Sequence, residues 1–270
     1  MSQIEKKYQI GVRKFGLVNW VGVYNLYVKE VTRFFIVWVQ TLLSPIISSL
    51  LFLSVLSLAI GNDRGEVLGF PFISFLAPGL IAMSIIQQSF AHSSSSIMIG
   101  KIQGNIIDTL LAPLSAAEVT LAIIFAAVTR SIIIAIISII VFSFIIKLYV
   151  YSYFYIFIFT FLGSFVLGSL GFITGIWAEK FDHMASVTNF LIVPLSFLSG
   201  TFYTIGNLPQ FLQIISKCNP FFYMIDGFRY GFLGKSDGSL FIGSFYLIIL
   251  AIMLFLSAYL LYKKGYKIKS

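Results

Sequence analysis

Residues 197–234 read FLSGTFYTIGNLPQFLQIISKCNPFFYMIDGFRYGFLG and lie between two long apolar runs. The stretch is apolar enough to lie at a bilayer, yet it also contains two prolines and three ionisable side chains, namely Pro209, Pro220, Lys217, Asp226 and Arg229. Each proline removes a backbone donor, and unpaired backbone polar groups are costly in hydrocarbon. The stretch therefore cannot cross lipid as one uninterrupted helix, and the pattern predicts a broken, hairpin-like or re-entrant element at a membrane face.

The composition is that of an integral membrane protein. Of the 270 residues, 59% are hydrophobic and 10% are charged, whereas a soluble domain has about 45–50% apolar and about 25% charged residues. A single cysteine excludes a disulfide within the chain and a cysteine-based metal cluster. The net charge of +8 comes largely from basic residues at the two ends of the chain, beside apolar runs, which favours membrane orientation over nucleic-acid binding.

We predict an all-α membrane protein with six transmembrane helices. Apolar runs close to the roughly 20 residues that a bilayer crossing needs lie at residues 34–60, 70–91, 119–146, 153–178, 184–198 and 241–262. The first run is much longer than the core of a signal peptide, so we expect it to remain as a span. Pro45 is expected to kink this span, and the serines at 93–96 are expected to end the second span at the interface.

The fourth span is rich in glycine. Its four glycines, with spacings of five, three and four residues, are Gly163, Gly168, Gly171 and Gly175. This pattern suits close packing between helices in lipid, where small residues let two backbones approach. Glycine that is merely tolerated in a membrane helix is an equal alternative.

Two polar segments flank the early spans. Residues 1–33 form a basic arm, in which polar side chains recur every three or four residues from Phe15 on, as in an amphipathic helix that lies in the interface. The alternative is the solvated foot of the first span. Residues 100–118 are too polar at their ends to span and too apolar at their centre to be a free loop. We expect a short helix there, then a turn, then a capping box at Ser115 and Glu118 that starts the third span.

Six spans place both termini on one side of the membrane. Twelve of the 18 Lys and Arg residues fall on that side, and the opposite side receives Arg64, Lys147, Lys217, Arg229 and Lys235. By the positive-inside rule, both termini are cytoplasmic. The segment 100–118 and the basic tail 263–270 are then cytoplasmic, and residues 199–240 form an extracellular cap.

No arrangement of catalytic or metal-binding side chains is visible in the sequence. Residues 234–236 read GKS, but a phosphate-binding loop needs a glycine where Arg229 stands and a buried strand before the loop. His92 and His183 are isolated at predicted ends of spans, with no spacing that suits a metal. We therefore expect that the chain is not an enzyme and has no ATPase site or cofactor of its own.

Three charges lie in unusual places. Arg130 falls inside the third span, where an ionisable group is a functional candidate by default. A carboxylate from the cytoplasmic side, Glu30, Glu179 or Asp182, could neutralise it, or its long side chain could snorkel to the interface. Asp226 and Arg229 are three residues apart on a predicted helix, so we expect them to form an ion pair.

The order of these features resembles the permease subunits of bacterial ATP-binding-cassette exporters of the ABC-2 type. The resemblance covers nearly the whole chain. It depends on the interfacial helix, the six spans, the segment NIIDTLLAPLSAAEVTLA at 105–122, and a series of short motifs in the predicted cap. These motifs are SG at 199–200, LP at 208–209, NP at 219–220 and DGFR at 226–229. The proline that the family usually has after the first aromatic of that stretch is absent, because Thr204 follows Tyr203.

The resemblance implies two sets of functional residues. The first would form a coupling helix that docks on an ATPase, and it comprises Asn105, Ile106, Ile107, Asp108, Leu110, Leu111, Pro113, Leu114 and Ser115. The second would form short re-entrant helices that cap the translocation path on the extracellular side, and it comprises Gly200, Pro209, Asn219, Pro220, Asp226 and Arg229.

The resemblance also implies partners and a location. The chain would pair with a second copy of itself and with two ATP-binding subunits, which would hold the ATP and magnesium, in the lipid bilayer of a bacterial inner membrane. The substrate would be amphipathic or hydrophobic, such as a drug, a lipid or a lipid-linked glycan. A secondary carrier or channel is the alternative, although neither an inverted repeat nor intramembrane carboxylates are visible. A membrane enzyme that acts on lipid is a third class, with residues 179–183 as its weak candidate.

Overall fold

The computed structural model describes residues 18–60, 65–146 and 148–268. Within them, five helices are long and apolar enough to cross a membrane: Val39–Ala59, Phe72–Ile102, Ala116–Ile145, Tyr153–Trp177 and Leu240–Lys263. The predicted all-α membrane fold is therefore confirmed, while the count of six spans is not. The expected basic arm and basic tail fall partly outside the described residues.

The described elements run in this order: α1 (Trp20–Ile36), the π-helical turn η1 (Val39–Leu43), α2 (Ser44–Ile60), β1 (Glu66–Val67), β2 (Phe70–Pro71), α3 (Phe72–Ile102), α4 (Ile106–Leu111), α5 (Ala116–Ile145), α6 (Tyr153–Trp177), α7 (Phe181–Val187), the π-helical turn η2 (Thr188–Ile192), α8 (Val193–Phe197), the 3₁₀ turn η3 (Ile205–Asn207), α9 (Gln210–Cys218), α10 (Pro220–Leu233) and α11 (Leu240–Lys263). The two short strands pair antiparallel and form a hairpin between α2 and α3.

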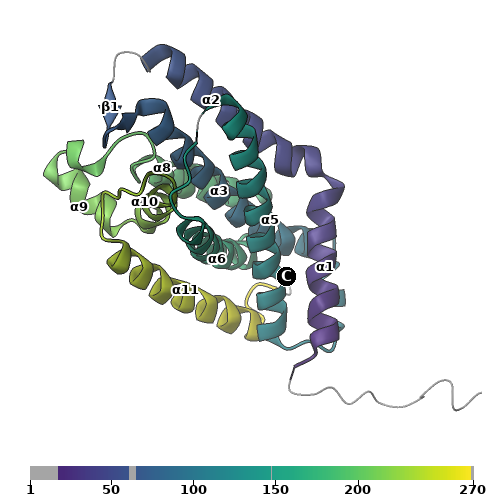
Figure 1. Ribbon diagram of the computed structural model, residues 1–270. Coiled ribbons are helices and arrows are strands. Elements are labelled where there is room, and N and C mark those ends of the chain that lie inside the picture. Colours follow the sequence, from purple (N-terminus) through teal and green to yellow (C-terminus); the bar gives the residue numbers. More distant parts are fainter. Residues whose placement is uncertain (1–17, 61–64, 147, 269–270) are drawn as a thin grey trace, which may run out of the picture.

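Helix α6 lies at the centre of the molecule, where it contacts α3, α5, α10 and α11 (Figure 1). Two glycines let α6 and α3 approach closely. A Cβ at Gly171 would lie 2.4 Å from the Phe90 carbonyl oxygen, and one at Gly175 would lie 2.8 Å from that of Ser94. At these two positions the packing interpretation of the glycines is confirmed, because a side chain would collide with backbone. At Gly163 a Cβ would meet only ordinary contacts, at 3.4 Å from Met224.

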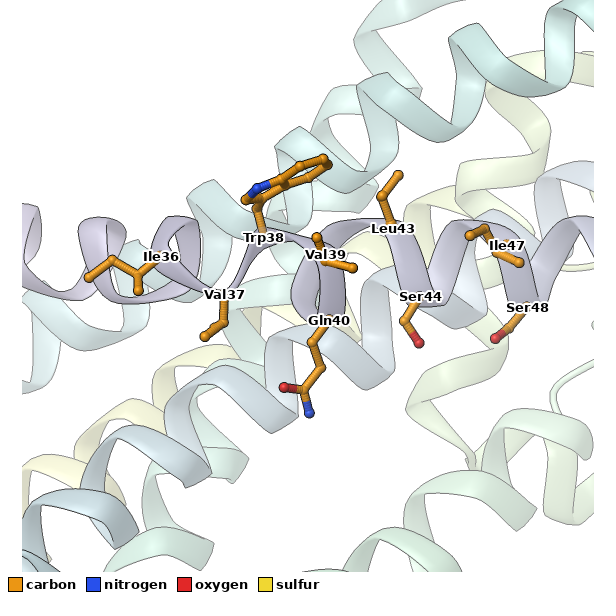
Figure 2. A pocket seen from close by; sticks show the side chains of 9 residues that line it. All are labelled: Ile36, Val37, Trp38, Val39, Gln40, Leu43, Ser44, Ile47 and Ser48. Atoms are coloured by element: carbon orange, nitrogen blue, oxygen red, sulfur yellow. The ribbon is translucent and has the colours of Figure 1, made fainter.

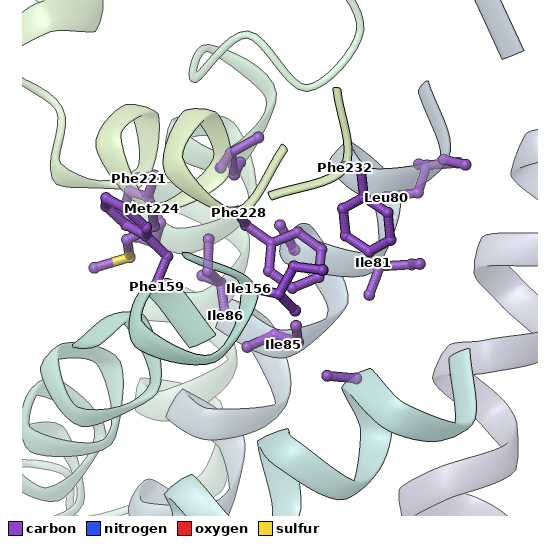
Figure 3. Packing of buried hydrophobic residues seen from close by; sticks show 14 of the residues in the cluster. Leu80, Ile81, Ile85, Ile86, Ile156, Phe159, Phe221, Met224, Phe228 and Phe232 are labelled. Atoms are coloured by element: carbon purple, nitrogen blue, oxygen red, sulfur yellow. The ribbon is translucent and has the colours of Figure 1, made fainter. Parts of the chain in front are cut away.

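The main core lies where α10 packs against α3 and α6 (Figure 3). Phe228 and Phe232 of α10 project toward Ile81 and Ile85 of α3, with Ile156 of α6 beside them. These five side chains are each 8% exposed or less. The helix that follows the second proline of the stretch 197–234 is thus buried among membrane helices instead of lying on the surface.

The first helical stretch is bent at Val37 and Trp38, between α1 and η1, and not at Pro45 as expected. The Thr41 hydroxyl satisfies carbonyls at the bend, at 2.8 Å from the oxygen of Phe34 and 3.0 Å from that of Val37. Pro45 is accommodated at the start of α2, directly after the π-helical turn. Helix α1, which corresponds to the expected interfacial helix, therefore continues to Ile36, and the first membrane-length segment begins at Val39.

The serines at 93–96 do not end a helix and do not face solvent as an exposed polar stop would, because two of them are fully buried. Helix α3 runs through them for 31 residues, and Ser93 and Ser94 are fully buried. Buried serine is tolerated here because the hydroxyl can bond a carbonyl one turn back: Ser94 donates to Phe90 at 2.9 Å, and Ser95 donates to His92 at 3.0 Å.

The expected fifth span corresponds to three short consecutive segments. Helices α7 and α8 and the π-helical turn between them comprise 7, 5 and 5 residues. This stretch is not among the five helices that could cross a membrane by length and composition.

Candidate functional site

Glu118 joins the starts of two helices at one end of the helix bundle. Its carboxylate accepts the backbone N–H of Asn19, ahead of α1, and that of Ser115, ahead of α5, each at 2.6 Å. The Ser115 hydroxyl accepts the Glu118 N–H at 3.3 Å, so the predicted capping box is confirmed. The Asn19 side chain donates to the Pro113 carbonyl at 3.0 Å. The N-terminus of α1, the turn after α4 and the start of α5 are therefore one hydrogen-bonded unit.

An apolar surface extends over this unit. In α4, Ile106 is buried, whereas Ile107 is 57% exposed and Leu111 is 80% exposed. On α1, Trp20 and Tyr24 are also exposed. A groove of about 390 Å³ separates the two helices and is lined by side chains of both, including Asn25 and Asp108. We call the exposed residues of α1 and α4 around this groove the α1–α4 surface. Leu110 is partly exposed at the edge of this surface. Asn105 directly precedes α4, and Pro113 and Leu114 lie in the turn after it and line the groove.

Charged groups are buried behind this surface, between α1 and α3. Glu30 is 5% exposed, its carboxylate lies 3.0 Å from Arg33 Nε, and the Nε2 of the fully buried His92 lies 3.7 Å away. Arg33 also donates to the His92 carbonyl oxygen at 3.2 Å and to the Ser95 hydroxyl at 3.4 Å. His92 is thus not an isolated interfacial histidine. Sequence reasoning missed this cluster because its members are about 60 residues apart and no local pattern connects them.

Arg130 lies deeper in the bundle and neither snorkels nor meets a carboxylate. It is 7% exposed, and its Nη2 donates to the Thr41 carbonyl oxygen at 3.3 Å and to the Gln88 side-chain oxygen. In the described part of the chain, no Asp or Glu lies within ion-pair distance of it. Pro45 lacks the N–H that would bond the Thr41 carbonyl in an α-helix, so Arg130 supplies a donor that the proline removes.

The predicted Asp226–Arg229 ion pair is wrong, because the two side chains bind different loops. Arg229 is 1% exposed, and its Nη2 donates to the carbonyl oxygens of Gly200 at 2.8 Å and Thr201 at 3.2 Å. Its guanidinium also lies 3.8 Å from the centre of the Phe75 ring. Such a cation–π contact stabilises a desolvated guanidinium. Arg229 therefore holds the SG turn at 199–200 against α3.

Asp226 instead holds the loop between α10 and α11. Its two carboxylate oxygens accept the backbone N–H groups of Asp237 and Gly238, each at 2.9 Å. Burial raises the pKa of Asp226 to about 6, although the two backbone hydrogen bonds and the charge of Arg229 oppose the rise. The geometry makes this carboxylate a structural brace and leaves it unavailable to a ligand.

The remaining residues of the predicted cap shape its turns. Gly200 has φ of +75°, a conformation that a side chain would strain. Pro209 precedes α9, and Pro220 opens α10. Asn219 caps α10 through the Phe221 N–H at 3.0 Å and donates to the Leu195 carbonyl at 2.7 Å, which ties α10 to α8. The motifs that carried the resemblance therefore come together in one packed unit around α8, α9 and α10.

The comparisons with known proteins agree with this arrangement. The family model described as ABC-2 type transporter matches residues 22–233. The chain belongs to the ABC-2 type transporter family. The inner membrane transport permease YadH of Escherichia coli strain K12 is 33% identical over 251 residues, which cover 93% of this chain and 98% of that relative. Nodulation protein J of Sinorhizobium fredii is 24% identical over 254 residues, which cover 91% of this chain and 94% of that protein.

Membership of the ABC-2 family makes this chain a membrane transport permease subunit. The match covers most of the α1–α4 surface, from residue 22 on, and the cap as far as residue 233, so the two regions that the sequence singled out lie largely within the family's own domain. Among the described residues, no group of three or more His, Cys, Asp or Glu side chains could hold a metal ion.

Proposed function

We propose that this chain forms the translocation path of an ATP-driven exporter in a bacterial inner membrane, with both termini in the cytoplasm. Two copies of the chain pair with each other and with two separate ATP-binding subunits, which hold the ATP and magnesium. The chain itself has no ATPase role. The stretch 181–197 forms a further, short span, and α9 and α10 form a re-entrant cap on the extracellular side.

The observation that carries this proposal is the α1–α4 surface and its attachment to α5. Exposed apolar patches occur where a protein contacts another protein or the membrane, and we assign the exposed tip at Ile107 and Leu111 to contact with the ATP-binding subunit. Because Glu118 ties this surface to the start of a helix of 30 residues, a displacement at the surface moves a membrane-length helix directly. This attachment supports a route by which ATP-driven closure of the partner subunits reaches the membrane part of the chain.

The experiment is co-purification with the ATP-binding subunit, followed by transport in liposomes. We expect Leu111→Glu to weaken the association at least tenfold, because a carboxylate buried without a partner in an apolar contact costs more than about 1.4 kcal/mol. The matched control is Phe211→Glu on α9, at another exposed apolar position. We expect this variant to bind the ATP-binding subunit normally.

Two results would overturn the proposal. One is transport by the isolated chain in liposomes without ATP, which would favour the secondary carrier or channel. The other is equal association of the Leu111→Glu and Phe211→Glu variants with the ATP-binding subunit, which would exclude the α1–α4 surface as the docking site.

A further inference from the structure

A row of uncharged polar side chains runs along an exposed side of η1 and α2, next to the side that packs against α3. Gln40, Ser44 and Ser48 are spaced by four residues, and Figure 2 shows them projecting from the same side of the helix, whereas Trp38 and Leu43 project from the other. All three polar side chains are exposed, and none of them bonds another side chain or backbone group among the described residues. Bare amides and hydroxyls are costly against lipid, so this side of α2 is suited to a polar occupant.

Two cavities meet along this row. One has a volume of about 600 Å³ and follows the bend from Ile36 to Ser48. The other, of about 240 Å³, lies between α2, α3 and the start of the cap. Ser44 and Ser48 line both, so the two hollows lie next to each other along α2, one beside the bend and the other beside the start of the cap.

The smaller cavity is lined by amides and hydroxyls, by three aromatic rings, and by the apolar side chains of Pro45, Leu80 and Met83. Gln87 and Gln88 of α3 face Ser44 and Ser48 of α2 across it. Arg130 occupies the Gln88 side-chain oxygen, which leaves the NH₂ group of Gln88 as a donor toward the cavity. Ser49 and Ser84 bond each other at 2.6 Å and close its wall.

Aromatic rings complete the cavity at the cap. Its remaining lining includes Phe52, Phe197 and Phe202. The Phe197 and Phe202 rings stack with centroids 5.3 Å apart, and Phe52 lies 5.8 Å from Phe202. Flat aromatic faces beside hydroxyls and amides suit a ligand that is apolar on one face and rich in hydrogen-bonding groups at its rim.

The lack of charged side chains in the described part of the lining indicates which class of ligand the cavity suits. Among the residues that the structure describes, no Asp, Glu, Lys or Arg lines either cavity. Arg130, which bonds the lining residue Gln88, is already engaged with the Gln88 amide and the Thr41 carbonyl. Hydroxyls and primary amides both donate and accept hydrogen bonds, so they match a group that does the same. A carboxylate, phosphate or ammonium would enter without a counter-ion, which is costly in a membrane.

We infer that this cavity is a binding site for an uncharged, hydroxyl-rich group, such as a sugar ring that carries an apolar tail. The inference depends on the proposed transport function and narrows its substrate from any amphipathic molecule to one with a neutral, polyhydroxylated head. The polar row along α2 then leads this head group from the bend toward the cap.

The test is photo-labelling of the complex in nanodiscs. The probe is octyl β-glucoside with a benzophenone in its tail, compared with octyl sulfate and octyl trimethylammonium that carry the same tail. We expect the glucoside to label peptides of 44–52 and 80–88, with competition by untagged octyl β-glucoside, and the two charged probes to label them at least tenfold less. Each hydrogen bond is worth about 1 kcal/mol, so Ser48→Ala and Gln87→Leu should each weaken glucoside labelling about fivefold.

The matched control is Ser257→Ala, on an exposed position of α11 where the hydroxyl bonds only its own helix. It should leave the labelling unchanged. Equal labelling by all three probes, or by the wild type and the Ser48→Ala and Gln87→Leu variants, would overturn the inference. So would a Ser48→Cys chain that cross-links to its own second copy and thereby loses the glucoside label. ATP-dependent transport in the same nanodisc preparation, transferred to liposomes, tests the proposed function separately, because it can persist when the head-group preference fails.

Discussion

At the scale of single residues, Arg229 decides how the cap is attached to α3. Replacement by Ala leaves the buried Gly200 and Thr201 carbonyls without a donor and removes the contact with Phe75. An unsatisfied buried acceptor costs about 1–3 kcal/mol, so we expect Arg229→Ala to lower the free energy of unfolding by about 3 kcal/mol, measured by denaturation in detergent. Lys217→Ala, at an exposed cation of α9, is the control and should change it by less than about 0.5 kcal/mol.

The pKa of Asp226 predicts how the free energy of unfolding changes with pH. Its folded pKa of about 6 lies above the ordinary value of 3.8, so the folded state holds this proton more tightly than the unfolded state between those two values. The contribution of this group to stability is therefore full below about pH 4, falls as the pH rises to about 6, and is constant above. Asparagine does not ionise, so we expect Asp226→Asn to abolish this pH-dependent fall in the free energy of unfolding, which is on the order of 1–3 kcal/mol in the wild type. Parallel wild-type and variant curves between pH 4 and 6 would contradict the assignment.

At the scale of helices, Gly171 and Gly163 offer a matched pair within α6. An added methyl group at Gly171 would collide with the Phe90 backbone, which cannot move without displacing α3, whereas at Gly163 it would meet a flexible methionine. We expect Gly171→Ala to destabilise the protein by about 1–3 kcal/mol and Gly163→Ala to be close to neutral. Thermal unfolding of the two variants in the same detergent measures the difference. Similar melting temperatures would show that close approach of the two backbones is not required.

The helices show which features of the fold could be predicted from the sequence. The existence of the long helices and the cap at Ser115 follow from local signals, since apolar length and the S-x-x-E pattern involve neighbouring residues. The bend at Val37 and the passage of α3 through Ser93 do not, because the hydroxyl-to-carbonyl hydrogen bonds that accommodate them leave no mark on apolar length or on a capping pattern. A hydroxyl run has the same composition whether it faces water or bonds back to its own helix. The residues next to Arg130 in the sequence likewise do not indicate its partners, which are the Gln88 side chain and the Thr41 carbonyl that Pro45 cannot bond.

The candidate functional residues also include some that the sequence could predict and some that it could not. The i, i+3 spacing of Asp226 and Arg229 suggests a mutual ion pair, whereas in the structure each side chain binds a separate loop. The polar row on α2 was visible only as scattered Gln and Ser in an apolar run. The sequence does not show that this row lines a cavity, because Gln87 and Gln88 lie opposite it only after α3 packs beside α2.

At the scale of the whole molecule, Cys218 tests the proposed topology, because it is the sole cysteine and lies exposed at the end of α9. If residues 199–240 face outward, a membrane-impermeant maleimide should label intact cells at this thiol, and a Cys218→Ser chain should give no signal. An engineered cysteine at Leu111 in that Cys218→Ser chain is the complementary control, since it should react only after the membrane is opened. Protection of Cys218 from outside, together with labelling of position 111 in intact cells, would invert the orientation and place the α1–α4 surface outside, where no ATP-binding subunit could reach it.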